Sequence, residues 1–319
     1  GSSEKFHGAV VDHDNSEDNR VFKEVTRVGE ALENIKAVKG SYKKAKVAII
    51  YDWENNWALN DAQGFSNASK RYPQTLQEHY RYFWNHDIAV EVITSEADFS
   101  KYELIIGPMM YLMTEDVMKR LSSYVKQGGT FVSTYITGYV NENDLTYLGG
   151  WPQPLREMFG IKVTETDTLY PKDRNAVHYA DQFFEAKDYC SLFELEGAEV
   201  LGTYTEDFYA GKPAITRNKY GQGAAYFIGA RTNLDFLEYF YGELAKNKGL
   251  ENAWVIKGDP DVSVQSRDFE NQSYRFVMNF SEETKEIQVA TACVDLLTRT
   301  THPTTLTLAP YEVLLLAEK

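Results

Sequence analysis

Cysteine is scarce in this chain, and its two copies, Cys190 and Cys293, lie far apart in the sequence. No CxxC motif occurs, and no group of Cys and His has the spacing of a zinc site, so neither a disulfide framework nor a metal site is expected. Two isolated thiols are typical of a reducing compartment, which predicts a cytoplasmic protein. No apolar run approaches the ~20 residues of a membrane-spanning helix, so no membrane partner is expected.

Basic residues are also in deficit, with 33 Lys and Arg against 47 Asp and Glu, and the net charge is −14. A nucleic-acid backbone or an anionic membrane surface requires a basic footprint, so neither partner is expected. The phosphate-binding patterns GxGxxG and GxxxxGK[ST] are absent, and so is the spacing of a calcium loop. We therefore expect no cofactor.

Aromatic residues are abundant, at 14% of the 319 positions. Such a share suits large packed cores and aromatic-lined interfaces, and it also suits sugar binding. The length allows two domains at roughly 100–200 residues each.

The first segment predicts an amphipathic helix whose partner is not evident from the residues before it. Its apolar positions recur at helical spacing and form one stripe: Val21, Val25, Val28, Leu32 and Ile35. A linker containing Gly40 follows, with Ser and Lys residues around it.

After this linker, short β-branched runs alternate with amphipathic helices, which predicts a mostly parallel sheet covered on both faces. A run of strands follows, with a hairpin around Gly221 and Gly223, and then a helix that ends near Gly249. The last part alternates apolar and polar residues and predicts a small all-β sandwich. The first four strands are expected at residues 46–52, 89–94, 102–108 and 129–138, with helices at 73–87 and 115–127.

Open parallel sheets bind ligands at the carboxyl ends of their strands, so the candidate site residues are expected there. Trp53 and Trp57 follow the first strand, as an aromatic platform or as packing against a neighbour. The polar cluster of Asn141, Glu142 and Asn143 follows the fourth strand.

Nucleophiles are poorly supported by the same segments. Ser133 and Thr134 lie inside the fourth strand without the flanks of a GxSxG elbow. Cys190 has no basic cluster beside it and is interpreted as an ordinary core or surface thiol.

Two stretches, "SSEKFHGAVVDHDNSEDNRVFKEV" and "STYITGYVNENDLTYLGGWPQPLREMFGIKV", resemble glycoside hydrolase family 42 β-galactosidases. The resemblance implies three parts: residues 1–38 from the end of a (β/α)₈ barrel, 39–249 as an amidotransferase-like (flavodoxin-like) trimerisation domain, and 250–319 as a small β-sandwich. It also implies a homotrimer in which loops carrying Trp53, Trp57, Asn141–Asn143 and Trp151 form an active-site mouth or an interface.

By the same resemblance, Glu4 and His7 contact the galactose unit of a terminal β-D-galactoside. A retaining glycosidase needs two carboxyl groups about 5–5.5 Å apart. In this family both come from earlier barrel strands, so this chain alone is expected to be inactive while its parent protein is a β-galactosidase. The alternative is a free-standing amidotransferase-like or carbohydrate-binding protein.

Overall fold

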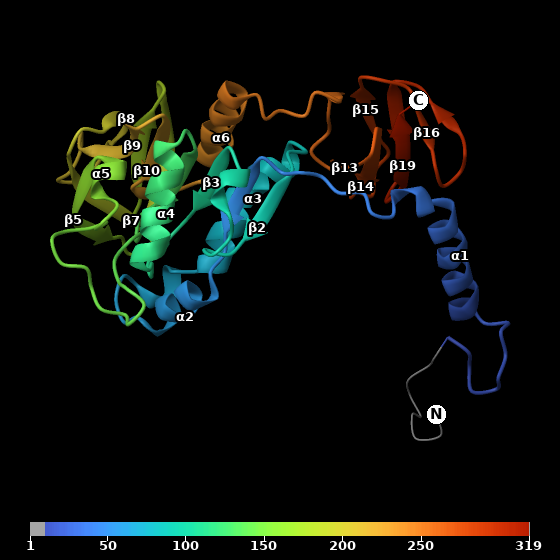
Figure 1. Cartoon of the computed structure of the whole chain (residues 1–319), viewed down its shortest axis with the longest axis horizontal. Coiled ribbons are helices and arrows are strands. Elements are labelled where there is room, and N and C mark those ends of the chain that lie inside the picture. Colours follow the sequence, from blue (N-terminus) through green and yellow to red (C-terminus); the bar gives the residue numbers. More distant parts are fainter. Residues whose placement is uncertain (1–9, 319) are drawn as a thin grey trace. The chain divides into compact units, whose positions relative to one another are not determined.

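The computed structural model describes residues 10–318, which separate into two compact units. The larger unit is Ala45–Glu251, and the smaller one joins the described residues before it to those from Asn252 onward (Figure 1). Each unit has hydrophobic clusters of its own. Within residues 10–318, no helix has the length and apolar content that a membrane crossing requires.

The larger unit contains five α-helices and eleven strands of one sheet. The helices are α2 (Trp53–Asp61), α3 (Tyr72–Asn85), α4 (Glu115–Lys126), α5 (Arg156–Phe159) and α6 (Leu234–Lys248). The strands are β1 (Val47–Ile50), β2 (Val90–Ile93), β3 (Leu104–Gly107), β4 (Thr130–Thr134), β5 (Ile161–Thr168), β6 (Asn175–Tyr179), β7 (Gln182–Leu195), β8 (Glu199–Tyr204), β9 (Pro213–Tyr220), β10 (Gly223–Ile228) and β11 (Ala230–Thr232).

The sheet is mixed, with the order β11-β7-β6-β8-β9-β10-β4-β3-β1-β2 and β5 beside β7. Only the part β2-β1-β3-β4-β10 is parallel, and every pairing from β10 to β11 is antiparallel. The expected parallel sheet is therefore confirmed for its first four strands, while the hairpins after Gly160 make the other half antiparallel. The hairpin at Gly221 joins the two halves.

Helices cover both faces of the parallel part, because its strands bury both rows of side chains. Along β1, Val47 and Ile49 belong to one hydrophobic cluster, which includes residues of α3 and α6. Ala48 and Ile50 belong to the other cluster, which includes residues of α4 and α5.

Helix α2 lies where a loop was expected after the first strand. Asp52 begins it by accepting a hydrogen bond from the Asn55 backbone N–H at 3.1 Å. The helix lacks a one-sided apolar stripe, since Trp53 and Trp57 are exposed while Asn55 is buried. Without that periodicity the sequence carried no helix signal.

The smaller unit is an all-β sandwich of two sheets, together with helix α1 (Arg20–Asn34) and a short 3₁₀ turn. One sheet has the order β12-β15-β18 and the other β13-β14-β19-β16-β17. The expected small sandwich is confirmed. Its strands are β12 (Val255–Lys257), β13 (Val262–Phe269), β14 (Gln272–Asn279), β15 (Lys285–Val289), β16 (Cys293–Asp295), β17 (Thr301–His302), β18 (Thr305–Leu308) and β19 (Val313–Glu318).

Helix α1 confirms the predicted amphipathic helix and is capped by Asn19, whose side chain accepts from the Phe22 N–H. None of its residues is buried. After the helix, Ile35 and Val38 pack against the sandwich. The apolar stripe itself stays exposed, at 42% to 60% of each side chain: Val21, Val25, Val28 and Leu32.

The contact between α3 and α6 contains a histidine that is closed off from water. His79 is buried, and its Nδ1 lies 2.6 Å from the Tyr241 hydroxyl. Burial lowers the pKa of His79 to about 3, and the positive charge of Arg231 acts in the same direction. The folded protein therefore keeps this imidazole neutral at neutral pH.

We predict that His79 makes the larger unit sensitive to acid. Between about pH 6.5 and pH 3 the unfolded chain binds a proton at His79 that the folded chain does not, so stability falls as the pH falls. The variant His79→Gln has no imidazole that the unfolded chain could protonate. Its free energy of unfolding should therefore fall less steeply with falling pH, by up to about 1.4 kcal/mol per pH unit. Urea unfolding at pH 6.5, 5.5 and 4.5 measures this dependence of the free energy of unfolding on pH.

The matched control is His86→Gln, which removes the exposed histidine just after the same helix. An equal change of slope in both variants would contradict the assignment to His79.

Candidate functional site

The carboxyl ends of β1, β2 and β3 meet at one edge of the sheet and line a cavity of about 280 Å³. Three polar side chains of its lining, Asp52, Ser95 and Arg120, are already hydrogen-bonded within the protein. The Ser95 hydroxyl donates to Asp52, and the Arg120 guanidinium donates to the backbone carbonyls of Ser95 and Ala97. Asp52 also begins α2. These side chains therefore stabilise the loops of this edge and do not form an assembled catalytic set.

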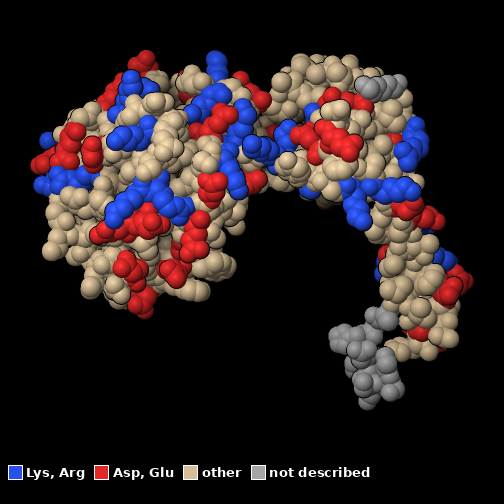
Figure 2. All heavy atoms as spheres, viewed as in Figure 1, with Lys and Arg blue, Asp and Glu red and all other residues tan. Residues whose placement is uncertain are grey.

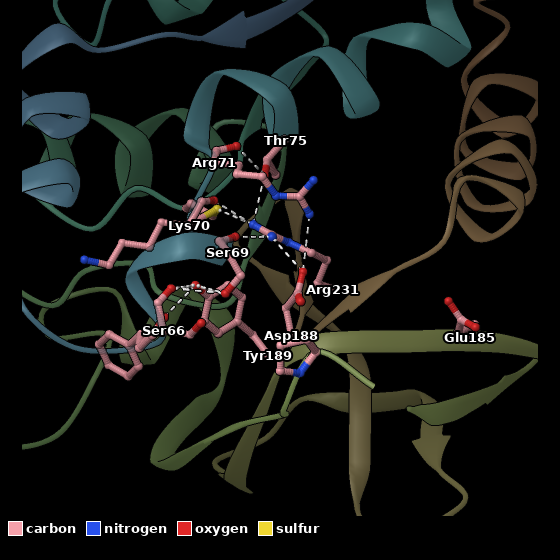
Figure 3. Close-up of polar contacts among 12 residues, drawn as sticks. Ser66, Ser69, Lys70, Arg71, Thr75, Glu185, Asp188, Tyr189 and Arg231 are labelled. Carbon is pink, nitrogen blue, oxygen red and sulfur yellow. Dashed lines mark hydrogen bonds and ion pairs between the residues drawn. The ribbon is translucent and has the colours of Figure 1, made fainter. Parts of the chain in front are cut away.

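At the ends of β3 and β4, the position where such a sheet would hold a ligand is occupied by Arg231 of β11 (Figure 3). This arginine is only 2% exposed. A guanidinium has five N–H donors, and here five protein oxygens can take them, so none is left for a ligand. The acceptors are the Tyr135 hydroxyl (2.7 Å), the Asp188 carboxylate (3.0 Å), the Thr75 hydroxyl (3.1 Å), the Lys70 carbonyl (2.7 Å) and the Ser69 carbonyl.

The backbone around this guanidinium is bent at several non-glycine residues with left-handed conformations. Ile136, just after β4, has a φ of 58°, and Met109, after β3, has a φ of 47°. For a β-branched residue this conformation is an outlier that costs roughly 1–2 kcal/mol. These strained turns persist because the surrounding contacts stabilise them by more than the strain costs.

The turn at Ile136 is where an amidotransferase-like sheet would carry its nucleophile, and here that position holds a buried hydrocarbon. The aliphatic hydroxyls nearby bind the backbone, and the Tyr135 hydroxyl accepts from Arg231. Ser133 donates to the Gly107 carbonyl at 2.6 Å, and Thr134 and Thr137 accept from the Met109 and Met110 N–H groups. No hydroxyl of this turn is positioned as a nucleophile.

Cys190 offers no nucleophile either. It is fully buried, and burial raises the pKa of its thiol to about 12, so the reactive thiolate is not formed at neutral pH. In the described part of the chain, no group of three or more His, Cys, Asp or Glu residues is placed to hold a metal ion.

The expected aromatic residues lie on the same end of the larger unit but differ in exposure. Trp53 and Trp57 are 58% and 62% exposed on α2, with ring centroids 6.3 Å apart. Trp151 is half-buried and stacks on Tyr139 at 4.1 Å, and its indole N–H donates to Thr146. Only the α2 pair therefore presents open ring surface.

The polar cluster after β4 forms a turn. Asn141 shapes it, because its side-chain oxygen accepts from the backbone N–H groups of Asn143 and Leu145. Glu142 and Asn143 are exposed. Glu4 and His7, the expected sugar contacts, lie outside the described residues.

Sequence reasoning missed the ion pair of this site, in which Arg231 is buried and Asp188 is partly exposed. The one available signal was an arginine between apolar strand residues, in "YFIGARTN". A lone arginine there does not disclose its partner, which lies on another strand.

We predict that Arg231→Met destabilises the larger unit by about 3–5 kcal/mol, because it leaves the Asp188 carboxylate, 17% exposed, without its buried partner. Chemical unfolding followed by circular dichroism measures the loss.

Arg71 supplies a matched control, because it pairs with the same carboxylate at 3.4 Å but is 43% exposed. Replacing Arg71→Met should cost less than about 1 kcal/mol. Equal losses of unfolding free energy in the two variants would show that the burial of Arg231 does not determine how much it stabilises the larger unit.

Comparisons with known proteins agree across nearly the whole chain. The family model described as β-galactosidase trimerisation domain matches residues 45–251, the C-terminal domain model matches 261–318, and a β-galactosidase model matches 1–35. β-Galactosidase GalA of Bacillus licheniformis is 54% identical over 98% of this chain, and GanA of Bacillus subtilis is 53% identical over 98%.

Solved structures agree with the fold. Gan42B, a GH42 β-galactosidase, superposes on all of this chain with a TM-score of 0.94 and 51% identity. The β-galactosidase of Bacillus circulans sp. alkalophilus gives 0.91 at 35% identity, also over the whole chain.

The chain spans about half the length of these proteins: 46% of GalA, 47% of GanA, 47% of Gan42B and 48% of the Bacillus circulans enzyme. The trimerisation-domain match alone covers more than half of the chain. This chain therefore belongs to the glycoside hydrolase family 42 β-galactosidases, of which it contains the trimerisation and C-terminal domains.

Proposed function

We propose that this chain is the assembly-forming part of a β-galactosidase and that it joins three copies into a homotrimer. The family match of residues 45–251 to a trimerisation domain carries this proposal. The strand ends support it, because Arg231 fills the position of a ligand with its donors already bound. A sheet without a free nucleophile is suited to architecture rather than to chemistry of its own.

The parent protein, in this proposal, hydrolyses terminal β-D-galactosides with retention and works in the cytoplasm. Its relatives carry the name β-galactosidase, which supports the reaction. Two free buried cysteines support a reducing compartment. The acid/base and nucleophile glutamates belong to a barrel outside residues 1–319, and Glu4 and His7 contact the galactose.

The exposed stripe of α1 supports a barrel contact in the first part of the chain. Residues 1–35 match the β-galactosidase model, and α1 buries none of its apolar residues by itself. A one-sided helix requires a partner surface. We assign residues 1–38 to the barrel, 39–249 to the trimerisation domain and 250–319 to the terminal sandwich.

The amidotransferase-like label is part of the same proposal. The parallel order β2-β1-β3-β4-β10 and the strained turn after β4 are its support. At this edge, helix α2 with Trp53 and Trp57 and the loops with Trp151 and the turn at Asn141–Asn143 form the interface or the active-site mouth.

We predict that residues 1–319 form a trimer and hydrolyse no chromogenic β-galactoside, whereas the full-length protein hydrolyses it. Multi-angle light scattering and a nitrophenyl galactoside assay measure the two properties.

A monomeric chain would contradict the assembly role, and turnover by the chain alone would contradict the missing catalytic glutamates. The alternative of a free-standing enzyme requires a reactive residue, so labelling of folded chain at Cys190 or Ser133 would support it.

A further inference from the structure

Helix α4 borders a second cavity of the larger unit, on the sheet face opposite α3 and α6. Its volume is about 300 Å³, at the lower end of the roughly 300–1,000 Å³ that small-molecule sites occupy. We call it the α4 cavity. Its polar side chains lie on one face of the helix, because they are three, four and seven positions apart. They are Lys119, Ser122, Ser123 and Lys126.

The rest of the lining is apolar except for one phenol. Met118, Pro154 and the ring of Tyr220 form it. Within residues 10–318, the hydroxyls of Ser122, Ser123 and Tyr220 and the ammonium of Lys126 have no hydrogen-bond or ion-pair partner. The cavity at the strand ends differs, since several of its polar side chains are bound within the protein. The polar groups of the α4 cavity therefore remain available to a ligand.

The lining of the α4 cavity is basic, although the chain has a net charge of −14. It contains two lysines and no Asp or Glu, and no acidic residue occurs between residues 117 and 141. Glu115 pairs with Lys119 at 3.0 Å, but both are largely exposed, and such a pair holds the ammonium weakly. Figure 2 shows blue basic groups over the region where Figure 1 draws α4. The lining therefore favours an anion.

The end of a helix ordinarily disfavours an anion, because its last carbonyls carry a partial negative charge. In α4 these carbonyls are already bound. Those of residues 123–126 accept from the backbone N–H groups of Gln127, Gly129, Gly128 and Gln222 in turn, at 3.0 to 3.1 Å. The donors come from the turn after the helix and from the hairpin at Gly221, and they offset the partial charge beside the cavity.

We propose that the α4 cavity binds a phosphorylated sugar. The two ammonium groups bind the phosphate as point charges. The serine and tyrosine hydroxyls can both donate and accept, as the hydroxyls of a sugar require. The ring of Tyr220, with Pro154 and Met118, packs against the apolar face of the sugar ring. This site goes beyond the proposed function, since it depends neither on the trimer nor on the barrel.

Isothermal titration calorimetry of residues 1–319 tests the proposal with four probes: glucose 1-phosphate, glucose 6-phosphate, inorganic phosphate and glucose. At least one sugar phosphate should bind. Inorganic phosphate should bind more weakly because it lacks the ring, and glucose should not bind because it lacks the charge. Sodium chloride should weaken the binding, because it screens exposed ion pairs. The proposal is wrong if neither sugar phosphate binds, or if glucose or inorganic phosphate binds as tightly as they do.

A pair of double variants tests the location of the site. Lys119→Gln with Lys126→Gln should weaken sugar-phosphate binding about tenfold, because each exposed charge pair contributes up to about 1 kcal/mol. The matched control is Lys172→Gln with Lys212→Gln, which removes two exposed lysines outside the cavity and changes the net charge equally. The control should bind like the wild type. Circular dichroism checks that both variants are folded. Equal affinities of the two double variants would overturn the assignment to the α4 cavity.

Discussion

The larger unit depends on a guanidinium held away from water. Arg231 lies at the centre of the strand-end region, and its acceptors come from the turn before α3, from the segment after β4 and from β7. Burying a charge costs several kcal/mol, which only a paired and fully hydrogen-bonded arrangement repays. The ion pair with Asp188 and the stacked rings of Tyr135 and Tyr189 provide that arrangement.

This buried cation explains why the strained turns persist. The residues with left-handed backbone include Met109, Ile136 and Asp188, and each of them or its neighbour contacts Arg231. Where an open sheet of this order usually leaves room for a ligand, this sheet has an internal cation with all its donors satisfied. At this edge the guanidinium and its acceptors fill the space that a ligand would occupy.

The local patterns of the chain predicted its regular elements well and its long-range pairings poorly. Strands β1 to β4 and helices α3 and α4 were predicted because their apolar periodicity is strong and short-ranged. Helix α2 was missed because its buried residues are asparagines that bind the backbone of a distant loop. The hairpin around Gly221 and Gly223 was predicted because its two strands are neighbours in the sequence. The order of the other antiparallel strands and the Arg231–Asp188 pair were missed, since both depend on partners far away in the sequence.

Each unit leaves one apolar helix surface uncovered, and the two surfaces differ in kind. The stripe of α1 is aliphatic and regular, which suits permanent packing against a large fold. Within the described residues its side chains are exposed to solvent. The surface of α2 is aromatic and bordered by acidic groups, which suits association between separately folded molecules.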